Sequence, residues 1–301
     1  LRIGRCLLLL AVPLALIAGL IWLLWPAPAV EGDADADISG IADPGDAFEV
    51  LSMSGEELHK GTLVEVNRSH AYTFPADQQL VSIFENKNSH YSVRDRNVLV
   101  DSRVMEPLNR LLEDFYRQSG LTTINVVAGQ RSYDYQQRLY QNSIAQNGEE
   151  HTKKYVAFPG YSEHHTGLAV DLSIFYENGT TGEYDGTGPY QWINDNAFRY
   201  GFVLRYPQDK EDRTGIAYEP WHFRYVGVPH AAVMTERGLC LEEYTTYLRQ
   251  FPYDGVHLKT TCDGVDYEIY YEAGSEIHVP KDRSYTVSGN NVDGFIVAVQ
   301  K

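Results

Sequence analysis

Residues 160–171 read Gly-Tyr-Ser-Glu-His-His-Thr-Gly-Leu-Ala-Val-Asp, and the rest of the chain is organised around this stretch. A second stretch, Glu219-Pro220-Trp221-His222, completes the set of side chains. Together they supply imidazoles and carboxylates, which are suitable ligands for a divalent metal. Catalytic zinc typically takes three protein ligands of this nitrogen and oxygen type and leaves one position for water. Glu219, three residues before His222, could then reach that water as a base.

The predicted ligands are His164, Asp171 and His222, and one of them has a competitor. If the segment formed one continuous strand, His165 rather than His164 would share a face with Asp171, because side chains alternate along a strand. Gly167 permits a bend or bulge that would break this alternation. We therefore predict His164 as the ligand and keep His165 as the alternative.

Hydrophobic patterning around this stretch predicts an α+β domain over residues 47–237, because helical and strand-like segments alternate irregularly. The clearest helix is the one before Gly120, where four large apolar residues recur on one face. Helices are expected over 101–118, 133–146 and 189–200. Strands are expected over 63–67, 121–128, 201–206 and 222–228, and from the 164–171 segment to residue 175. A polar loop is expected from Gly148 to Pro159.

After Gly238 the sequence consists mainly of short strand-like segments separated by turn residues, and residues 238–301 are expected to form a small β-rich C-terminal extension. A helix is expected over 241–250 and strands over 265–271, 275–279, 284–288 and 295–299. Cys240 and Cys262 fall in this extension, and a disulfide between them would close a loop of about twenty residues, with a stabilisation of about 3 kcal/mol in the chain-entropy model. Two unpaired buried thiols are the alternative, because spacing alone does not prove geometry.

The sequence of the N-terminal part predicts that the protein is attached to a membrane. Arg2 and Arg5 precede an apolar run over residues 6–25 that is long enough to cross a bilayer as a helix. The arginines place the N-terminus in the cytoplasm, so residues 1–25 are expected to be a transmembrane signal-anchor with the catalytic domain outside the cytoplasm. A cleaved signal peptide is the alternative, because Ala27-Pro28-Ala29 has the form of a cleavage site. Residues 26–46 contain six acidic residues and no basic one and are expected to be a solvated linker.

Charge and motif content exclude some classes of function. The formal net charge of -16 argues against nucleic acid as a partner and against adhesion to an anionic surface. The sequence contains neither Gly-x-Ser-x-Gly nor Ser-x-x-Lys, so a serine-nucleophile hydrolase is disfavoured.

Two motifs resemble those of the VanY-type D-alanyl-D-alanine carboxypeptidases, zinc peptidases of bacterial cell-wall metabolism. The family pattern Ser-x-His-x-x-Gly-x-Ala-x-Asp is present at residues 162–171, and Glu-Pro-Trp-His-x-Arg-Tyr-Val-Gly is present at 219–227. Shorter matches occur at Arg131-Ser132-Tyr133 with Gln136, and at 200–207. The resemblance covers roughly residues 60–235. It implies a zinc domain with the fold shared by Hedgehog proteins and D,D-peptidases.

The resemblance also implies roles for particular residues. His164, Asp171 and His222 would bind one Zn²⁺, and Glu219 would act as the general base on its water. Arg131 would stabilise the developing oxyanion. Substrate contacts would come from Ser162 and Gln136, which hold the terminal residue and its carboxylate, and from Tyr133 and Trp221, which form walls of the cleft.

The expected substrate is the stem peptide of peptidoglycan, from which a terminal D-alanine would be released. An L,D-carboxypeptidase acting on the tetrapeptide stem is the nearest alternative, since relatives with the same zinc motifs have that activity. An endopeptidase acting on cross-links, which needs a cleft open at both ends, and a non-catalytic wall-binding module are more distant alternatives.

Overall fold

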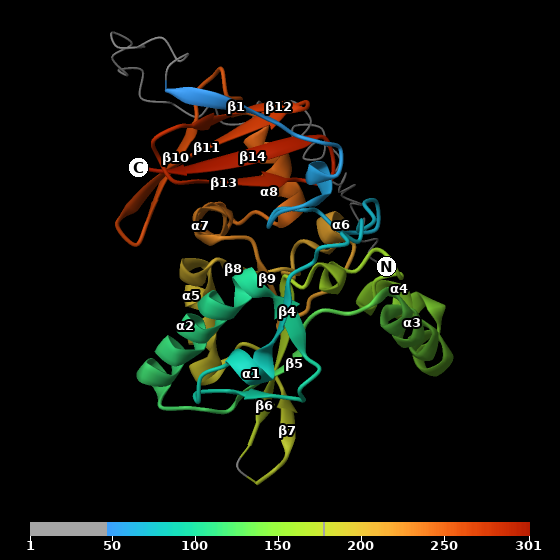
Figure 1. Cartoon of the computed structure of the whole chain (residues 1–301). Coiled ribbons are helices and arrows are strands. Elements are labelled where there is room, and N and C mark those ends of the chain that lie inside the picture. The colour runs from blue at the N-terminus through green and yellow to red at the C-terminus, as the bar shows by residue number, and fades with distance from the viewer. Residues whose placement is uncertain (1–46, 177) are drawn as a thin grey trace, which may run out of the picture. The chain divides into compact units, whose positions relative to one another are not determined.

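A mixed β-sheet carries Asp171 and His222, two of the three predicted metal ligands. The computed structural model describes residues 47–176 and 178–301, which belong to one compact unit (Figure 1). The strands of this sheet, in spatial order, are β3 (Ser92–Val93), β5 (Ile124–Ala128), β6 (Ala169–Phe175), β9 (His222–Tyr225) and β8 (Phe202–Leu204), and β7 (Thr181–Glu183) pairs with β6. Only the β3–β5 pairing is parallel. The expected α+β class is confirmed.

The register of this sheet brings the two motifs together. Strands β6 and β9 are antiparallel, and Asp171 lies directly opposite His222. On the other side of β6, Ala128 at the end of β5 is the partner of Asp171, next to an irregularity in the β5–β6 pairing. Opposed residues in antiparallel strands have Cβ atoms about 5 Å apart. The pairing therefore places a carboxylate and an imidazole from distant parts of the chain side by side.

Helix α2 (Ser102–Ser119) covers the sheet and confirms the helix predicted from its apolar stripe. The Asp101 side chain caps its first turn by accepting a hydrogen bond from the Arg103 backbone, and Gly120 ends it in the left-handed conformation with φ 72°. The residues of the stripe are buried in the main core together with side chains of β5 and β6. Smaller elements complete this part of the molecule: η3 (Glu57–His59), β2 (Leu80–Ser82), α1 (Ile83–Asn86), β4 (Leu99–Asp101), η5 (Gly188–Tyr190), α5 (Gln191–Asn196), η6 (Ala197–Tyr200) and α6 (Glu211–Thr214).

Two consecutive helices, α3 (Tyr133–Asn147) and α4 (Glu149–Tyr155), form a hairpin beside the sheet (Figure 1). The first was predicted, but the second replaces the expected polar loop. Helix α4 has no apolar stripe that could reveal it. It is favoured by acidic residues in its first turn and lysines in its last, which complement the helix dipole. Only Gln136 of α3 and Thr152 of α4 are buried, so the hairpin is mostly solvated.

The C-terminal part contains two helices and a second sheet. Helices α7 (Val228–Arg237) and α8 (Leu241–Leu248) precede β10 (Leu258–Cys262), β11 (Val265–Ala273), β12 (Glu276–Pro280), β13 (Tyr285–Gly289) and β14 (Gly294–Gln300). The four-stranded sheet has the order β10-β11-β14-β13, and β12 pairs with β1 (Phe48–Ser52). The predicted helix and four strands of this region are confirmed, whereas α7 and β10 were not predicted.

One hydrophobic cluster joins residues from both sides of the predicted boundary at residue 238. It includes Leu63, Val203 and Val226 from before the boundary and Leu241 and Ile269 from after it. All of them are buried. The C-terminal sheet therefore shares a core with the site-bearing part.

The strand expected at residues 63–67 is absent. The segment alternates in hydrophobicity, but Leu63, Val64, Glu65 and Val66 are all buried, so it has no solvent-facing side. Its backbone is paired irregularly, since the Leu63 amide donates to the Ser288 hydroxyl and the Glu65 amide donates to the Asn290 carbonyl. Individual hydrogen bonds to residues 288 and 290 thus take the place of regular β-pairing in this segment.

The predicted disulfide is not present. Cys240 and Cys262 are free thiols, and both are buried. Cys240 is the N-cap residue of α8, and the charges of Glu242, Arg205 and Glu243 act on the pKa of its thiol. Cys262 is the last residue of β10, where the charges of Asp263 and Arg199 act on the pKa of its thiol. The two thiols therefore lie in different surroundings, and burial raises the pKa of both.

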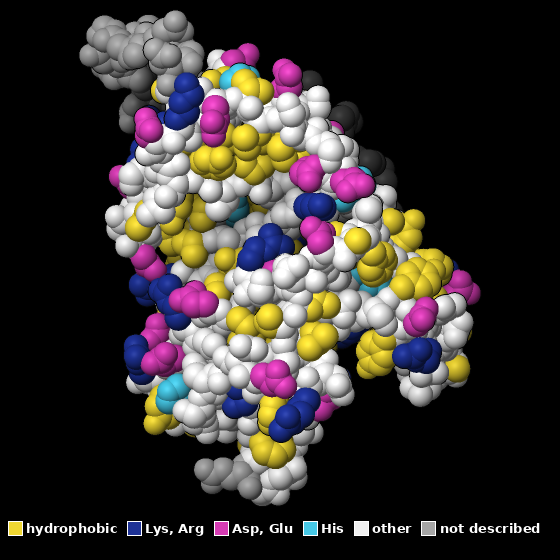
Figure 2. All heavy atoms as spheres, in the orientation of Figure 1, with side chains coloured by type: hydrophobic (Ala, Val, Ile, Leu, Met, Phe, Trp, Pro, Cys, Tyr) yellow, Lys and Arg dark blue, Asp and Glu magenta, His cyan; other side chains and the backbone are white. Residues whose placement is uncertain are grey.

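Among the described residues, no helix has the length and apolar character needed to cross a membrane. The predicted signal-anchor and linker, residues 1–46, lie outside the described residues. On the face that Figure 2 shows, Lys and Arg side chains are scattered among Asp and Glu side chains.

Candidate active site

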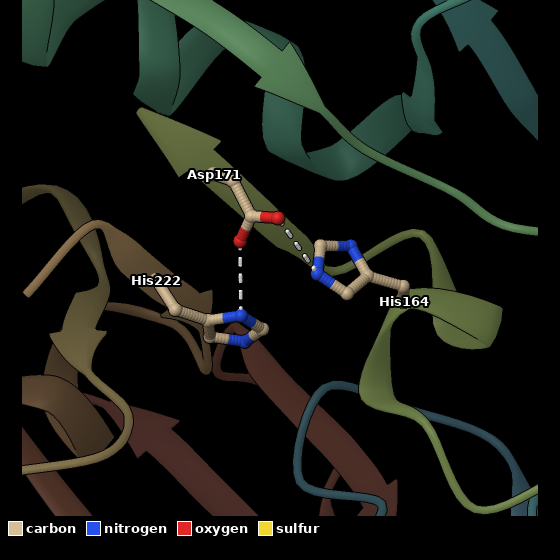
Figure 3. A group of neighbouring side chains, drawn as sticks. All are labelled: His164, Asp171 and His222. Atoms are coloured by element: carbon tan, nitrogen blue, oxygen red, sulfur yellow. Dashed lines mark ion pairs between the residues drawn. The ribbon is translucent and has the colours of Figure 1, made fainter. Parts of the chain in front are cut away.

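Three predicted side chains meet at one point. His164 comes from the 3-10 turn η4 (Glu163–Thr166), Asp171 from β6 and His222 from the start of β9 (Figure 3). His164 Nε2 lies 3.3 Å from Asp171 Oδ2, and His222 Nδ1 lies 3.0 Å from Asp171 Oδ1. One ligand atom from each of the three residues lies within 4.8 Å of the others, and all three residues are buried. This arrangement can hold a metal ion.

The structure brings His164, not His165, beside Asp171. The 164–171 segment is not a continuous strand, because η4 ends at Gly167, whose φ is 73°. His165 turns to the other side, where its Nδ1 donates to the Arg131 carbonyl and its Nε2 accepts from the Gly160 amide. Both nitrogens of His165 are therefore engaged by the backbone.

The surroundings of His164 prepare it as a neutral ligand. Its Nδ1 lies 2.7 Å from the Gly129 carbonyl, which can only accept, so Nδ1 carries the proton and Nε2 keeps its lone pair toward Asp171. Burial lowers the pKa of His164 to about 4, and the positive charge of Arg131 acts in the same direction. The imidazole is thus neutral at physiological pH.

Negative charge dominates around His222. Burial by itself lowers its pKa, but the neighbouring carboxylates of Asp171 and Glu163 outweigh burial and raise the pKa to about 9. Burial likewise opposes ionisation of Asp171, yet the positive charge around it, including that of Arg131, holds the pKa of that carboxyl well below its usual value. Positive charge is therefore favoured between these groups, and a dication would supply it.

Unpaired polar atoms give a direct test of whether a metal fits. Among the described residues, four buried side-chain polar atoms lack a hydrogen-bond partner, and all belong to residues at this site: Gln136 Oε1, Glu163 Oε2, Asp171 Oδ1 and His222 Nε2. Buried polar atoms are rarely left unpaired without a functional reason. Asp171 Oδ1 lies in the centre of the ligand group, and two imidazoles with one carboxylate form a donor set that zinc takes in catalytic sites. The site therefore fits Zn²⁺.

Glu219 is a second buried carboxylate with a different pKa. It lies in the turn before β9, which is closed by a hydrogen bond from the His222 amide to the Glu219 carbonyl. Its Oε2 is 3.7 Å from His222 Nδ1. Burial raises the pKa of Glu219 to about 7. A carboxylate with a pKa near neutrality can both accept and return a proton.

Arg131 lies on the other side of Asp171. One of its guanidinium nitrogens, Nη2, is 2.6 Å from Asp171 Oδ2. The Arg131 amide donates to the carbonyl of His164, which ties the start of α3 to η4. The side chain is 20% exposed, so the guanidinium has further donors that can reach a ligand.

A cavity of about 480 Å³ opens beside these groups. Its walls include the three predicted ligands, Glu219 and Arg131, together with the predicted substrate contacts Ser162, Gln136 and Trp221. Tyr133 is not among the lining residues; it is 45% exposed and its ring stacks on that of His165. Polar side chains of α3 extend the cavity away from the ligand group: Asn142, Ser143, Gln146 and Asn147.

Two residues of the site were missed by the sequence analysis. Tyr206 lines the cavity and its ring lies 4.8 Å from that of His222. Glu163 is fully buried behind His222, although it was present in the motif only as a variable position. Arg205 and Arg224 could have indicated a buried acidic residue such as Glu163, since an arginine in or beside a buried strand requires an acidic partner.

Comparisons with known proteins identify relatives of this chain. A family model described as VanY, D-alanyl-D-alanine carboxypeptidase, matches residues 97–228. A curated D-alanyl-D-alanine carboxypeptidase of Enterococcus faecium is 34% identical over 258 residues, which cover 82% of this chain and 78% of the relative.

Two solved structures are also similar. The vancomycin-resistance D,D-dipeptidase VanXYg, in complex with a D-Ala-D-Ala phosphinate analogue, has a TM-score of 0.75 and 34% identity over 84% of this chain and 99% of its own. The LD-carboxypeptidase LdcB has a TM-score of 0.50 and 34% identity over 60% of this chain and 84% of its own. The first of these matches extends beyond the span of the family model into the flanking parts of the chain.

Proposed function

The chain belongs to the VanY family of D-alanyl-D-alanine carboxypeptidases, and we propose that it removes the terminal D-alanine from peptidoglycan stem peptides in a zinc-dependent reaction. The observation that carries this proposal is the convergence of His164, Asp171, His222 and Glu219 on one cavity. The D-Ala-D-Ala analogue bound to the related VanXYg enzyme supports the choice of substrate.

The three buried ligands would hold one zinc ion through His164 Nε2, His222 Nδ1 and a carboxylate oxygen of Asp171. Zinc bound there would polarise the scissile carbonyl and make the attacking water more acidic. The chain itself supplies the orientation: the Gly129 carbonyl fixes the tautomer of His164, and β-pairing fixes Asp171 opposite His222.

Proton transfer is assigned to Glu219. With a pKa near 7, this carboxylate is partly ionised at neutral pH and can accept a proton from the attacking water. It can then give the proton to the amine of the departing D-alanine. Arg131 would stabilise the negative charge that develops on the carbonyl oxygen, using guanidinium donors that Asp171 leaves free.

Substrate positioning is assigned to the cavity wall. Gln136 donates through Nε2 to the Ala157 carbonyl, and its buried Oε1 has no partner. The free Oε1 is a hydrogen-bond acceptor, so it can bind an N–H group of the substrate but not the terminal carboxylate, which was the predicted partner of Gln136. Ser162, whose side chain can donate, remains the candidate for carboxylate binding, and Trp221 forms part of the wall.

A second candidate function is L,D-carboxypeptidase activity on the tetrapeptide stem. It is favoured by the similarity to the LD-carboxypeptidase LdcB. The two activities would use the same metal chemistry and differ in the stereochemistry of the residue before the cleaved bond. A wall-binding module without catalysis is disfavoured, because a buried carboxylate with a pKa near 7 would have no use in it.

The experiment that tests the proposal follows D-alanine release from synthetic stem pentapeptide and tetrapeptide by the chain from residue 46 onward. Zinc-dependent loss of the last residue of the pentapeptide, with the tetrapeptide intact, is the expected result. Activity should disappear with a chelator and return with added zinc. Preference for the tetrapeptide would move the protein to the L,D class, and no release from either peptide would refute carboxypeptidase function.

We also propose that the catalytic unit works outside the cytoplasm, attached to the cell membrane through residues 6–25. The apolar run with arginines on its N-terminal side supports this, as does the location of peptidoglycan. Membrane fractionation and protease accessibility of the tagged C-terminus in intact spheroplasts would test it. Recovery of the protein from the cytosolic fraction would refute it.

A further inference from the structure

Glu163 is a fully buried carboxylate that lies behind the metal ligand His222. Its Oε1 accepts two charged hydrogen bonds, from Arg205 Nε at 2.7 Å and from Arg224 Nη1 at 2.6 Å. Its Oε2 has no partner and faces His222 Nε2, which also has none, across 3.6 Å. Two buried polar atoms without partners, one an acceptor and one able to donate, therefore point at each other.

We propose that Glu163 is a positioning residue of the metal site, holding His222 in the tautomer and orientation in which Nδ1 faces the metal. A ring that ligates through Nδ1 carries its proton on Nε2, and Glu163 Oε2 is the acceptor placed to receive it. A shift of a few tenths of an ångström would bring the pair into hydrogen-bond range. Outer carboxylates of this kind orient ligating histidines and increase their basicity.

Glu163 is itself held in place by two buried arginines. Arg224 also donates through Nη2 to the carbonyls of Thr62 and Val64, in the buried segment that replaced the expected strand. Arg205 directs its other two nitrogens to Glu242 of α8, at 2.9 and 2.6 Å. The two carboxylates thus balance the two guanidiniums, and neither arginine is left with an uncompensated buried charge.

The C-terminal part therefore contributes to the metal site. Glu242 belongs to α8, beyond the span of the family model, yet it is linked to His222 by Arg205 and Glu163. A side chain that restrains Arg205 also restrains the carboxylate behind the ligand. Residues 238–301 are then a support of the active site and not a separate module attached to it.

The test measures zinc affinity of the full chain by competition with a chromogenic chelator, so it does not depend on the substrate. Glu163→Gln should weaken zinc binding about 10- to 100-fold. Glu242→Gln should weaken zinc binding by no more than about tenfold, because Glu242 is linked to Glu163 only through Arg205. Glu65→Gln is the matched control, because Glu65 is a buried carboxylate of the same region that bonds Thr245, His70 and Asn67. Its link to the proposed chain of contacts is indirect, through Asn67, which also donates to Glu242.

A second measurement needs no variant and covers the case in which Glu163→Gln does not fold. In the zinc-loaded wild type, the imidazole nitrogen and proton resonances of His222 should show a proton on Nε2 that exchanges slowly with water. Rapid exchange of that proton, or wild-type zinc affinity in folded Glu163→Gln, would overturn the inference. The inference rests on the zinc site of the proposed function, and failure of the wild type to bind zinc would refute that function instead.

Discussion

At the scale of single residues, the carboxyl groups of Asp171 and Glu219 both lie within 4 Å of the His222 imidazole, but their pKa values shift in opposite directions. Asp171 is kept ionised in spite of its burial by positive charge around it, including that of Arg131, whereas burial raises the pKa of Glu219 to about 7. Such a separation assigns roles, since a permanently ionised group suits metal binding and a group that titrates near neutrality suits proton transfer.

Glu219→Gln should leave zinc binding near the wild-type level and lower kcat by about 10²- to 10⁴-fold, because the amide keeps the shape but cannot take the proton. Zinc content by atomic absorption and D-alanine release from the pentapeptide would be measured on the same preparation. Near-normal turnover in the variant would show that another group is the base.

At the scale of elements, the turn η4 decides which histidine lies beside Asp171 in the predicted metal site. Gly167 ends the turn with φ 73°, and a Cβ built on it would lie 2.8 Å from the Asp101 amide nitrogen and 3.0 Å from a methyl group of Leu80. The Gly167 carbonyl also accepts a hydrogen bond from that amide. The turn is thus pressed against the start of α2, where there is no room for a side chain.

Gly167→Ala should therefore destabilise the protein by more than the cost of the left-handed conformation, which is about 1–2 kcal/mol. Gly120→Ala is the matched control, since Gly120 has φ 72° and no atom within 4 Å of a built Cβ. Urea unfolding of both variants would measure the difference, with about 1 kcal/mol or more of additional loss expected at Gly167 from overpacking. Equal losses would mean that the turn can shift without cost.

Some elements of the fold could be predicted from the sequence and others could not. The apolar stripe of α2 was sufficient to predict that helix. The two motifs, together with the bend that Gly167 permits, predicted the three side chains that the structure brings together. Helix α4 was not predictable from hydrophobicity, because it buries only Thr152. The segment at 63–67 was misinterpreted because alternation cannot distinguish a half-buried strand from a chain enclosed on both sides. Glu163 was missed because its partners, Arg205 and Arg224, are distant in sequence.

At the scale of the whole molecule, His230 connects stability to pH. It lies in α7, its Nδ1 is 2.8 Å from the Tyr244 hydroxyl of α8, and burial lowers its pKa to about 3. An unfolded histidine has a pKa of about 6.5, so between these two values the unfolded chain binds more protons. The contribution of His230 is complete above pH 6.5 and is lost as the pH falls toward 3.

The free energy of unfolding should therefore fall below pH 6.5 by up to about 1.4 kcal/mol per pH unit from this group alone. His230→Gln, which keeps a hydrogen-bonding side chain without the titration, should flatten this dependence. Urea titrations at pH 7.5, 6.5 and 5.5 on both proteins would test it. Parallel curves for the two proteins would exclude His230 as a source of the acid sensitivity.

Removal of residues 238–301 should abolish the fold of the remaining part. The deletion exposes the buried side chains of Leu63, Val203 and Val226 and leaves Arg205 buried without Glu242. Residues 47–237 are expected to show no cooperative thermal transition by circular dichroism and no zinc binding, in contrast to residues 47–301. A stable fragment that binds zinc would show that the shared core is dispensable.

The pairing of β1 with β12 has a consequence for the order in which the protein can assemble. Val50, among the first described residues, lies opposite His278, close to the C-terminus. This ladder, like the link from Glu242 to the predicted metal site, requires sequence that leaves the ribosome after both site motifs. Contacts this distant in sequence form late because loop closure has to precede them. Hydrolytic activity should therefore begin only after residues 242 and 276–280 have been synthesised, so that a nascent chain that ends before them is inert.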